Sequence, residues 1–289
     1  MTINTLNTLF TSFSYNRNRA AQYRAVTGDK MSNQTNSRVV IVTGASQGIG
    51  HAIARTFLNN GDIVVGCAFS APEKAVQAQQ LSDAFPAHFF YYQVNVSDTA
   101  QIKQFVASVE QRFGRIDVVV SNAGKNVFKG IDCEESDWEH NFNLNLRSHW
   151  FLAKCARQSL QKNRGTLLLM TSNHAFSTMR GCAPYNISKR ALLSLVQSLT
   201  IEWGPEIRTV GIAPGFIDTD GNQAWFDSHP DARIAREKTI QKHPVGRIGR
   251  PEEVGELCLF LASDKAGFIA GTTILIDGGR SAIMQDEDE

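Results

Sequence analysis

Tyr185 and Lys189 lie four residues apart in the segment Pro184-Tyr-Asn-Ile-Ser-Lys189. In a helix this spacing places both side chains on one face, one turn apart. A free phenol has a pKa of about 10, and a nearby ammonium group favours the phenolate and lowers that pKa. The pair is therefore a candidate acid/base unit that moves a proton on or off an alcohol oxygen. Alone it is a weak signal, because a surface tyrosine packed on a lysine stem has the same spacing.

A glycine-rich turn stands between a predicted strand and a predicted helix near the start of the chain. The apolar, β-branched run Val39–Val42 is typical of a buried strand, and helical spacing of apolar residues begins at His51. Between them lie Gly44, Gly48 and Gly50, which permit a tight turn and a close approach to a pyrophosphate. This order is the context of a dinucleotide-binding turn, although the spacing is G-x-x-x-G-x-G. A glycine turn that binds no nucleotide is the alternative.

Ser172 follows the apolar run 166–170 and precedes Tyr185 by thirteen residues. A hydroxyl at the carboxyl end of a central strand faces the crevice where open α/β sheets bind ligands. We therefore expect Ser172 and the Tyr185–Lys189 pair to share one site.

Strand-like and helix-like segments alternate along the chain. This alternation predicts an α/β fold, a Rossmann-type doubly wound parallel sheet of about seven strands with helices on both faces. The segment 219–247 interrupts the pattern after the sixth strand and is predicted to be a lid, in which Trp225 and Phe226 either face the substrate or pack the lid to the body. The expected strands are 38–43, 63–67, 89–94, 116–120, 166–171, 208–213 and 273–276, and the expected helices are 48–60, 72–84, 99–113, 137–161, 184–203 and 251–263.

Composition narrows the class of protein. The 289 residues with 42% hydrophobic content suit a single domain over 37–283, between a disordered extension at 1–36 and an acidic tail at 284–289. A net charge of +1 argues against nucleic-acid binding, and no apolar run is long enough to span a membrane. Five widely spaced cysteines without a C-x-x-C argue against disulfides and a metal site, and favour the cytoplasm. The arginines of residues 1–30 also fit an organellar transit peptide.

With these motifs in order, the sequence resembles the short-chain dehydrogenase/reductase family, in its branch of shorter chains. The closest similarity is to ketoacyl reductases and to sugar or polyol dehydrogenases. The resemblance runs from Arg38 to Gly279, nearly the whole chain. The matching motifs are Thr43-Gly-Ala-Ser-Gln-Gly-Ile-Gly50, Asn122-Ala-Gly124, Asn145, Ser172, Tyr185-x-x-x-Lys189, Pro214-Gly215 and Asp277-Gly-Gly279.

The resemblance implies an NAD(P)-dependent oxidoreductase that interconverts a secondary alcohol and a ketone or aldehyde by hydride transfer. Tyr185 would exchange the hydroxyl proton, and Lys189 would lower the tyrosine pKa and hold the nicotinamide ribose. Ser172 would hydrogen-bond the substrate oxygen, where negative charge develops. Asn145 would hold a water that links Lys189 to solvent.

The resemblance also implies a set of cofactor-binding residues. Asn95 replaces a usual aspartate beside the adenine, and its amide oxygen can still accept a hydrogen bond. Ile217 would offer its backbone N–H, and Thr219 its hydroxyl, to the carboxamide. Besides Tyr185 and Lys189, the set is Gly44, Ser46, Gln47, Gly48, Ile49, Gly50, Phe69, Ser70, Asn95, Val96, Asn122, Ala123, Gly124, Pro214, Gly215, Ile217 and Thr219.

The end of the second strand favours NADP over NAD. A carboxylate there would bind the ribose 2′-hydroxyl of NAD, but the position holds Ala68, followed by Phe69 and Ser70. Asp62 has a suitable distance from the glycines but precedes the strand, at its wrong end. The basic residue typical of NADP-preferring relatives is also missing, since Gln47 stands in the turn, so NAD stays open.

The substrate expected from the resemblance is a small alcohol or ketone, with a sugar and a simple ketone both open. His174 is expected to form part of the pocket wall. By resemblance we expect a homotetramer formed through helices 137–161 and 184–203 and the last strand. One competing hypothesis is a non-catalytic nucleotide-binding regulator on the same fold. Another is a sugar-nucleotide epimerase or dehydratase, which usually needs a larger carboxyl-terminal domain.

Overall fold

A computed structural model describes residues 37–283. Within them seven parallel strands form one sheet in the order β3-β2-β1-β4-β5-β6-β7. The order reverses between β1 and β4, which makes their carboxyl ends the switch point where such sheets bind ligands. The strands are β1 (Val39–Thr43), β2 (Ile63–Ala68), β3 (Phe89–Gln93), β4 (Val118–Ser121), β5 (Thr166–Met170), β6 (Arg208–Pro214) and β7 (Thr273–Ile276).

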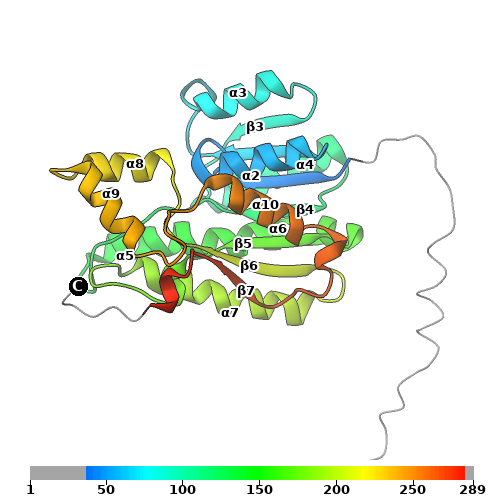
Figure 1. The fold of residues 1–289 in the computed structure, drawn as a ribbon. Helices are drawn as coiled ribbons and strands as arrows, with labels where there is room; N and C mark the ends of the chain where they lie inside the picture. Colours follow the sequence, from blue (N-terminus) through cyan, green and yellow to red (C-terminus); the bar gives the residue numbers. More distant parts are fainter. Residues whose placement is uncertain (1–36, 284–289) are drawn as a thin grey trace, which may run out of the picture. The chain divides into compact units, whose positions relative to one another are not determined.

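Helices cover both faces of the sheet (Figure 1), which confirms the predicted doubly wound fold. One face carries α2 (Gly48–Asn59), α3 (Val76–Ala84) and α10 (Pro251–Leu261). The other carries α4 (Thr99–Phe113), α6 (Ser148–Asn163) and α7 (Tyr185–Trp203). Three further helices, α5 (Glu135–Phe142), α8 (Asp220–Asp227) and α9 (Ala232–Gln241), lie at the carboxyl edge of the sheet.

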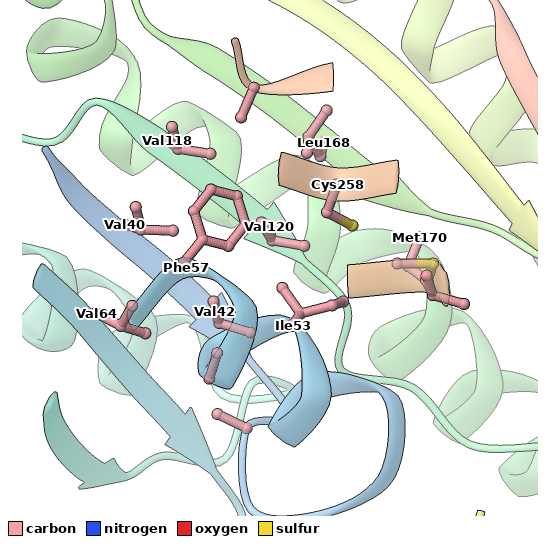
Figure 2. Packing of buried hydrophobic residues seen from close by; sticks show 14 of the residues in the cluster. Val40, Val42, Ile53, Phe57, Val64, Val118, Val120, Leu168, Met170 and Cys258 are labelled. Atoms are coloured by element: carbon pink, nitrogen blue, oxygen red, sulfur yellow. The ribbon is translucent and has the colours of Figure 1, made fainter. Parts of the chain in front are cut away.

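The core consists of two apolar layers, one on each face of the sheet. Figure 2 shows the layer on the α2 and α10 face, where Phe57 and Ile53 of α2 lie near the valines of β1 and Cys258 of α10 lies near β4 and β5. Phe57 is fully buried. Burying a side chain of this size stabilises the fold by about 1.5–3 kcal/mol. The β-branched runs read as strands from the sequence are thus buried because helices cover both of their faces.

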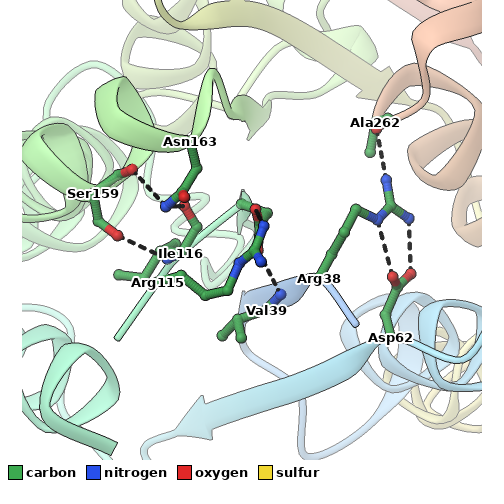
Figure 3. Close-up of polar contacts among 9 residues, drawn as sticks. Arg38, Val39, Asp62, Arg115, Ile116, Ser159, Asn163 and Ala262 are labelled. Carbon is green, nitrogen blue, oxygen red and sulfur yellow. Dashed lines mark hydrogen bonds and ion pairs between the residues drawn. The ribbon is translucent and has the colours of Figure 1, made fainter. Parts of the chain in front are cut away.

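Ion pairs close the amino edge of the sheet, opposite the ligand-binding edge (Figure 3). Arg38 reaches Asp62 with Nε and Nη2 at 2.9 and 2.8 Å and donates to the carbonyl of Ala262 at 2.8 Å. Asp117 accepts from the backbone N–H of Val39 at 2.8 Å. Asp62 therefore pairs with Arg38 at the amino end of β2, the end opposite to the one where a ribose would bind.

Two predicted helices are interrupted. The helix expected over 137–161 divides into α5, a π-helical turn at Asn143–Arg147, and α6. The helix expected over 72–84 divides at Ala75, because a 3₁₀ turn at Pro72–Lys74 precedes α3. Apolar periodicity does not separate these helix types, and Pro72 begins a turn that the pattern alone joins to the following helix.

Two predictions lie outside the described residues, namely the disordered extension at 1–36 and the acidic tail at 284–289. Among residues 37–283, no helix is long and apolar enough to cross a membrane. The same part of the chain holds no cluster of His, Cys, Asp and Glu side chains suited to a metal ion.

Candidate active site

The predicted catalytic residues come from adjacent elements at the carboxyl edge of the sheet. Ser172 follows β5, Tyr185 is the first residue of α7, and Lys189 lies one turn later. Tyr185 and Lys189 are only 7% and 3% exposed. The hydroxyl of Thr171 donates to the carbonyl of Lys189 at 2.8 Å, which ties α7 to the end of β5.

Lys189 and Asn145 meet beside the backbone of Gly124. A Cβ added at Gly124 would lie 3.4 Å from Lys189 Nζ and 2.8 Å from Asn145 Oδ1, so this position has no room for a side chain. Lys189 Nζ lies 5.7 Å from the centroid of the Tyr185 ring and donates to the carbonyl of Met170 at 3.0 Å. Among residues 37–283 this is the only hydrogen bond of Lys189 Nζ, so the ammonium form has two further N–H groups for a ligand.

The pKa values of Tyr185 and Lys189 shift in directions that their spacing did not predict. Burial raises the pKa of Tyr185 to about 12, and a side-chain hydrogen bond from Ser172 opposes that rise. Burial also lowers the pKa of Lys189 to about 7. The expected lowering of the tyrosine pKa by Lys189 is therefore wrong for this structure. The physical reason is desolvation, which disfavours the charged form of both groups and weakens the lysine as a neighbouring cation.

Asn145 is fully buried in the π-helical turn, and both ends of its side-chain amide are engaged. Its Oδ1 accepts from the backbone N–H of Lys125 at 3.0 Å, and its Nδ2 donates to the Lys125 carbonyl and to Asn141 Oδ1, both at 2.9 Å. The side chain therefore clamps the segment that follows β4.

Asn141 is a site residue that the sequence analysis missed. It is fully buried at 0% exposure, and its Nδ2 donates to the carbonyl of Pro184 at 3.1 Å, directly before Tyr185. Its Oδ1 accepts from Asn145 and, at 3.4 Å, from the hydroxyl of Ser188. Asn141 thus connects the π-helical turn to the start of α7. An asparagine on the apolar face of a predicted helix was the only available signal.

A second missed residue, His149, lies on α6 beyond Asn145. Its Nδ1 is 2.8 Å from the hydroxyl of Ser121, and its buried Nε2 has no hydrogen-bond partner among the described residues. Burial, followed by the charge of Lys189, holds the pKa of His149 well below its usual value. The ring is therefore a neutral neighbour of the catalytic lysine.

Aromatic rings form the wall on the substrate side of Tyr185. The ring of Phe128 packs edge-on against that of Tyr185 at a centroid distance of 5.3 Å, and the ring of His174 lies 6.0 Å from it. His174 Nδ1 is 3.1 Å from the hydroxyl of Thr178, and burial lowers the pKa of His174. His174 therefore lies beside Tyr185, and burial favours the neutral form of its ring.

The glycine turn has the geometry of a phosphate cradle. Gly44 and Gly48 adopt positive φ values of 72° and 58°, and a Cβ at Gly50 would clash with the carbonyl of Gly44. Asp98 caps α4 by accepting from backbone N–H groups, whereas α2 has no capping side chain and no acid in its first turn. The first turn of α2 therefore has free amide donors and a positive dipole end, which suit a pyrophosphate.

Other predicted cofactor residues surround this cradle. The hydroxyl oxygen of Thr43 accepts from the backbone N–H groups of Asn122 and Ala123, both at 2.9 Å, which joins the ends of β1 and β4. A Cβ on Gly48 would lie 3.4 Å from the methyl group of Thr219, so the start of the predicted lid faces the glycine turn. The hydroxyl oxygen of Thr219 caps α8 by accepting from the backbone N–H of Asn222 at 3.3 Å.

The remaining predicted cofactor residues lie at three strand ends. Asn95 Oδ1 accepts from the backbone N–H of Ser97 at 3.0 Å, so one lone pair of this oxygen is already used. Pro214 ends β6, and Gly215 packs against Asp277 so closely that a Cβ would lie 2.6 Å from the Asp277 Cβ. Ser46, Gln47 and Ile49 lie in the glycine motif between Thr43 and Gly50, Val96 follows Asn95, and Ile217 lies two residues after Gly215.

The end of β2 exposes Phe69, which is 75% exposed. The hydroxyl of Tyr91 donates to the carbonyl of Ser70 at 2.8 Å. Burial raises the pKa of Tyr91 to about 12, and a side-chain hydrogen bond with Ser46 opposes that rise. Tyr91, another residue that the sequence analysis missed, therefore links the strand end to the glycine turn.

The two aromatic residues of the predicted lid, Trp225 and Phe226, differ in their exposure to solvent. Phe226 is only 1% exposed, and its ring lies 5.3 Å from that of Phe216. Trp225 is 45% exposed and packs against His229, with ring centroids 4.4 Å apart. Phe226 therefore packs α8 to the end of β6, while Trp225 presents part of its ring to solvent.

Comparison with known proteins agrees with this architecture. Residues 44–281 match the family model described as enoyl-(acyl carrier protein) reductase. The chain is 34% identical to the 3-oxoacyl-[acyl-carrier-protein] reductase FabG of Escherichia coli (strain K12), over 84% of this chain and 96% of the relative. It is 33% identical to an NAD-dependent glycerol dehydrogenase of Listeria innocua, over 84% of this chain and 93% of the relative. The solved aldohexose dehydrogenase of Thermoplasma acidophilum superposes with a TM-score of 0.79 at 28% identity, covering 88% of this chain and 97% of that one.

The chain belongs to the short-chain dehydrogenase/reductase family. It is an NAD(P)-dependent oxidoreductase of the class that acts on CH–OH groups. The comparisons give no support to the alternative of a non-catalytic regulator.

Proposed function

We propose that this enzyme interconverts a secondary alcohol and a ketone, with Tyr185 as the general acid/base. The observation that carries the proposal is the convergence of Tyr185, Ser172 and Lys189 at the carboxyl edge of the sheet, beside the glycine cradle. The nicotinamide supplies or accepts the hydride at the carbinol carbon. The protein supplies a proton and holds the substrate oxygen.

In the reducing direction the Tyr185 hydroxyl gives its proton to the substrate oxygen as the carbonyl carbon gains the hydride. Its pKa of about 12 keeps the phenol protonated at neutral pH, which is the form this step needs. The Ser172 hydroxyl donates to the same oxygen and stabilises the charge that develops on it. In the oxidising direction the phenolate accepts the hydroxyl proton.

Lys189 resupplies the proton in this proposal. Its amine has a pKa of about 7, so it gains and loses protons readily near neutral pH. Since the Asn145 side chain is occupied by Lys125 and Asn141, the proposed path to solvent follows the main chain of the π-helical turn. Asn145 then acts by holding this turn in place beside Lys189.

NADP is the proposed cofactor. The side chains at the end of β2 are those of Phe69 and Ser70, and no carboxylate stands there to repel a 2′-phosphate. The hydroxyl of Tyr91 already donates to the carbonyl of Ser70, and that of Ser46 bonds to Tyr91, so the Ser70 hydroxyl is the donor proposed for the phosphate. A thermal-shift comparison of NADPH and NADH tests this preference, because a ligand stabilises the folded state in proportion to RT ln(1 + [L]/Kd).

A homotetramer in the cytoplasm is also proposed. Large apolar side chains are exposed on α6 (Trp150), α7 (Ile201) and β7 (Leu275), the elements expected at the interfaces. The five free cysteines suit a reducing compartment. Light scattering of the purified protein measures the assembly, and a monomer would contradict this part of the proposal.

The test of the mechanism is Tyr185→Phe. Removing the hydroxyl should lower kcat by about 10²- to 10⁴-fold, the usual contribution of a general acid/base, with little change in NADPH affinity. Tyr92→Phe is the matched control, because the Tyr92 ring packs against Phe105 on the far side of β3 from the cradle. Turnover of Tyr185→Phe at a rate close to the wild type would show that the proposed role is wrong.

A further inference from the structure

Arg280 is a half-buried cation beside the substrate wall. It lies in the 3₁₀ turn Arg280–Ala282, directly after Gly279. Its Nη2 contacts the sulfur of Met179 at 3.9 Å. Met179 belongs to the segment between Ser172 and Tyr185, so the guanidinium group of Arg280 reaches the wall of the catalytic site.

The carboxylate of Asp277, three residues before Arg280, is occupied by the backbone. Its Oδ1 accepts from the N–H of Gly279 at 3.0 Å, and its Oδ2 accepts from the N–H of Ser281 at 2.8 Å. Among residues 37–283, no carboxylate forms an ion pair with Arg280. By contrast, Arg236 of α9 pairs with Asp218 at 2.6 Å.

An unpaired guanidinium group in this position is costly. Burial lowers the pKa of Arg280, which records the loss of hydration around its charge. A buried cation normally has an anionic partner, because its desolvation is otherwise uncompensated. The surroundings of Arg280 therefore leave a place for an anion from outside the described chain.

The charge of Arg280 acts within the catalytic wall. After burial, the positive charge of Arg280 is the second cause that lowers the pKa of His174. The ring of His174 in turn lies 6.0 Å from that of Tyr185. Lys125, exposed after Gly124, places a second cation at this edge of the sheet. An anion bound to Arg280 would therefore lie against the wall segment that holds Met179 and His174, and His174 is a neighbour of Tyr185.

We infer that the substrate carries an anionic group, such as a carboxylate, which pairs with Arg280 while its alcohol or ketone faces Tyr185. This inference rests on the proposed function and names the substrate class of the same site. A guanidinium group matches a carboxylate or a phosphate with two parallel hydrogen bonds. The substrate class is thus hydroxy acids and keto acids, or the corresponding phosphate esters, rather than neutral alcohols.

Kinetics on matched pairs of substrates test the inference. The pairs are an aliphatic 3-oxo acid and its methyl ester, an aldonic acid and the corresponding alditol, and dihydroxyacetone phosphate and dihydroxyacetone. The wild type should prefer the anionic member of at least one pair. Arg280→Met should lower kcat/KM for that anion by on the order of 10- to 100-fold, mainly through KM, and leave the neutral member unchanged. A preference within the phosphate pair alone would assign the anion as phosphate.

Two variants control for indirect effects. Lys162→Met removes one positive charge from an exposed residue in the last turn of α6, far from Asn145, and should leave both members of each pair unchanged. Arg280→Lys keeps the positive charge but lacks the paired N–H donors of the guanidinium group, so it should retain part of the preference for the anion. Thermal unfolding of Arg280→Met checks that the variant is folded.

Three results would overturn the inference. The first is equal turnover of anionic and neutral members by the wild type, and the second is an equal loss for both members in Arg280→Met. The third is that ending the chain at Ile283 removes the difference between Arg280→Met and the wild type, because the charge of Arg280 would then serve the acidic residues 286–289 and not the substrate. The proposed function survives all three. An enzyme that binds NADPH but neither reduces the ketone pairs nor oxidises the alcohol pair would overturn the proposed function together with this inference.

Discussion

The amide nitrogen of Asn145 donates to the amide oxygen of Asn141 at 2.9 Å, and both side chains are fully buried. Asn141 also donates to the carbonyl of Pro184, so one side chain joins the π-helical turn to the residue before the catalytic tyrosine. The two asparagines therefore fix the distance between the segment that holds Lys125 and the start of α7. Catalytic geometry at Tyr185 depends on that distance.

Asn141→Leu should lower kcat on the order of 10-fold while leaving the KM for the cofactor nearly unchanged. Leucine has a similar volume, but it removes the acceptor of Asn145 and the donor to Pro184. The expected loss of stability is about 1–2 kcal/mol. Asn143→Ala is the control, since the Asn143 side chain bonds only with Arg147 at the surface among the described contacts. Equal kcat values for Asn141→Leu and the wild type would show that Asn141 has no positioning role.

The two directions of the reaction should respond differently to pH. Because burial raises the pKa of Tyr185 to about 12, the phenolate that oxidation needs is scarce at neutral pH. The rate of alcohol oxidation should therefore increase about tenfold per unit between about pH 8 and about pH 10. Ketone reduction should show no such gain, because the phenol is already protonated. Initial rates measured in both directions check this.

Ser172→Ala provides the matching test of the hydrogen bond to Tyr185. This bond opposes the rise in the pKa of Tyr185, so its loss should move the oxidation profile to more alkaline pH. An oxidation rate that peaks at neutral pH in the wild type would contradict the assignment of Tyr185 as the titrating base.

Lys189→Met should change stability in a pH-dependent manner. Burial lowers the pKa of Lys189 from 10.5 to about 7, so between these values the unfolded chain binds more protons and wild-type stability rises with pH. Below about pH 7 the amine is charged in both states and its full desolvation cost is present. The melting temperature of Lys189→Met relative to the wild type should thus be higher at about pH 6 than at about pH 9.

Lys162→Met serves as the control for this measurement, because it removes a lysine from an exposed position in the last turn of α6. A melting-temperature difference between Lys189→Met and the wild type that is constant with pH would mean that Lys189 keeps its ordinary pKa in the folded protein. The Lys189→Met variant should lose its catalytic activity at every pH.

The fold could be predicted because its signals are local. Val39–Val42 and similar β-branched runs, each followed by a turn, locate the strands to within two residues of their observed ends. Gly44 and Gly48 adopt positive φ values, which glycine reaches without steric cost, so the turn could be located from these two glycines. The alternation of strands with helices then indicates that the strands run parallel, while their order in the sheet is known only from the structure.

The electrostatics and the polar partners of the site could not be predicted in this way. Asn141 and Pro184 are far apart in sequence, and Arg280 reaches Met179 from the other end of the chain. No periodic pattern carries such contacts. The spacing of Tyr185 and Lys189 predicted a lowered tyrosine pKa, but their burial in the folded chain reverses the direction. Burial is a tertiary property, and a spacing of four residues does not report it.

The end of β2 offers the sharpest test of the proposed NADP preference. Phe69 is largely exposed, so Phe69→Asp should fold with little loss of stability. The new carboxylate would stand where a 2′-phosphate is proposed to bind, and it would repel that dianion while accepting from the ribose hydroxyls of NAD. The Kd for NADPH should increase by on the order of 10-fold or more, and the Kd for NADH should stay equal or decrease.

Phe69→Ala separates the added charge from the lost ring. If the charge is responsible, the alanine variant should keep the wild-type ratio of the two dissociation constants, as measured by thermal shift or by quenching of protein fluorescence. Two outcomes would contradict the proposal. A wild type that binds NADH more tightly than NADPH would show that the missing carboxylate at Ala68 and Phe69 does not set the preference. An equal weakening of both cofactors in Phe69→Asp would place the 2′-phosphate away from this strand end.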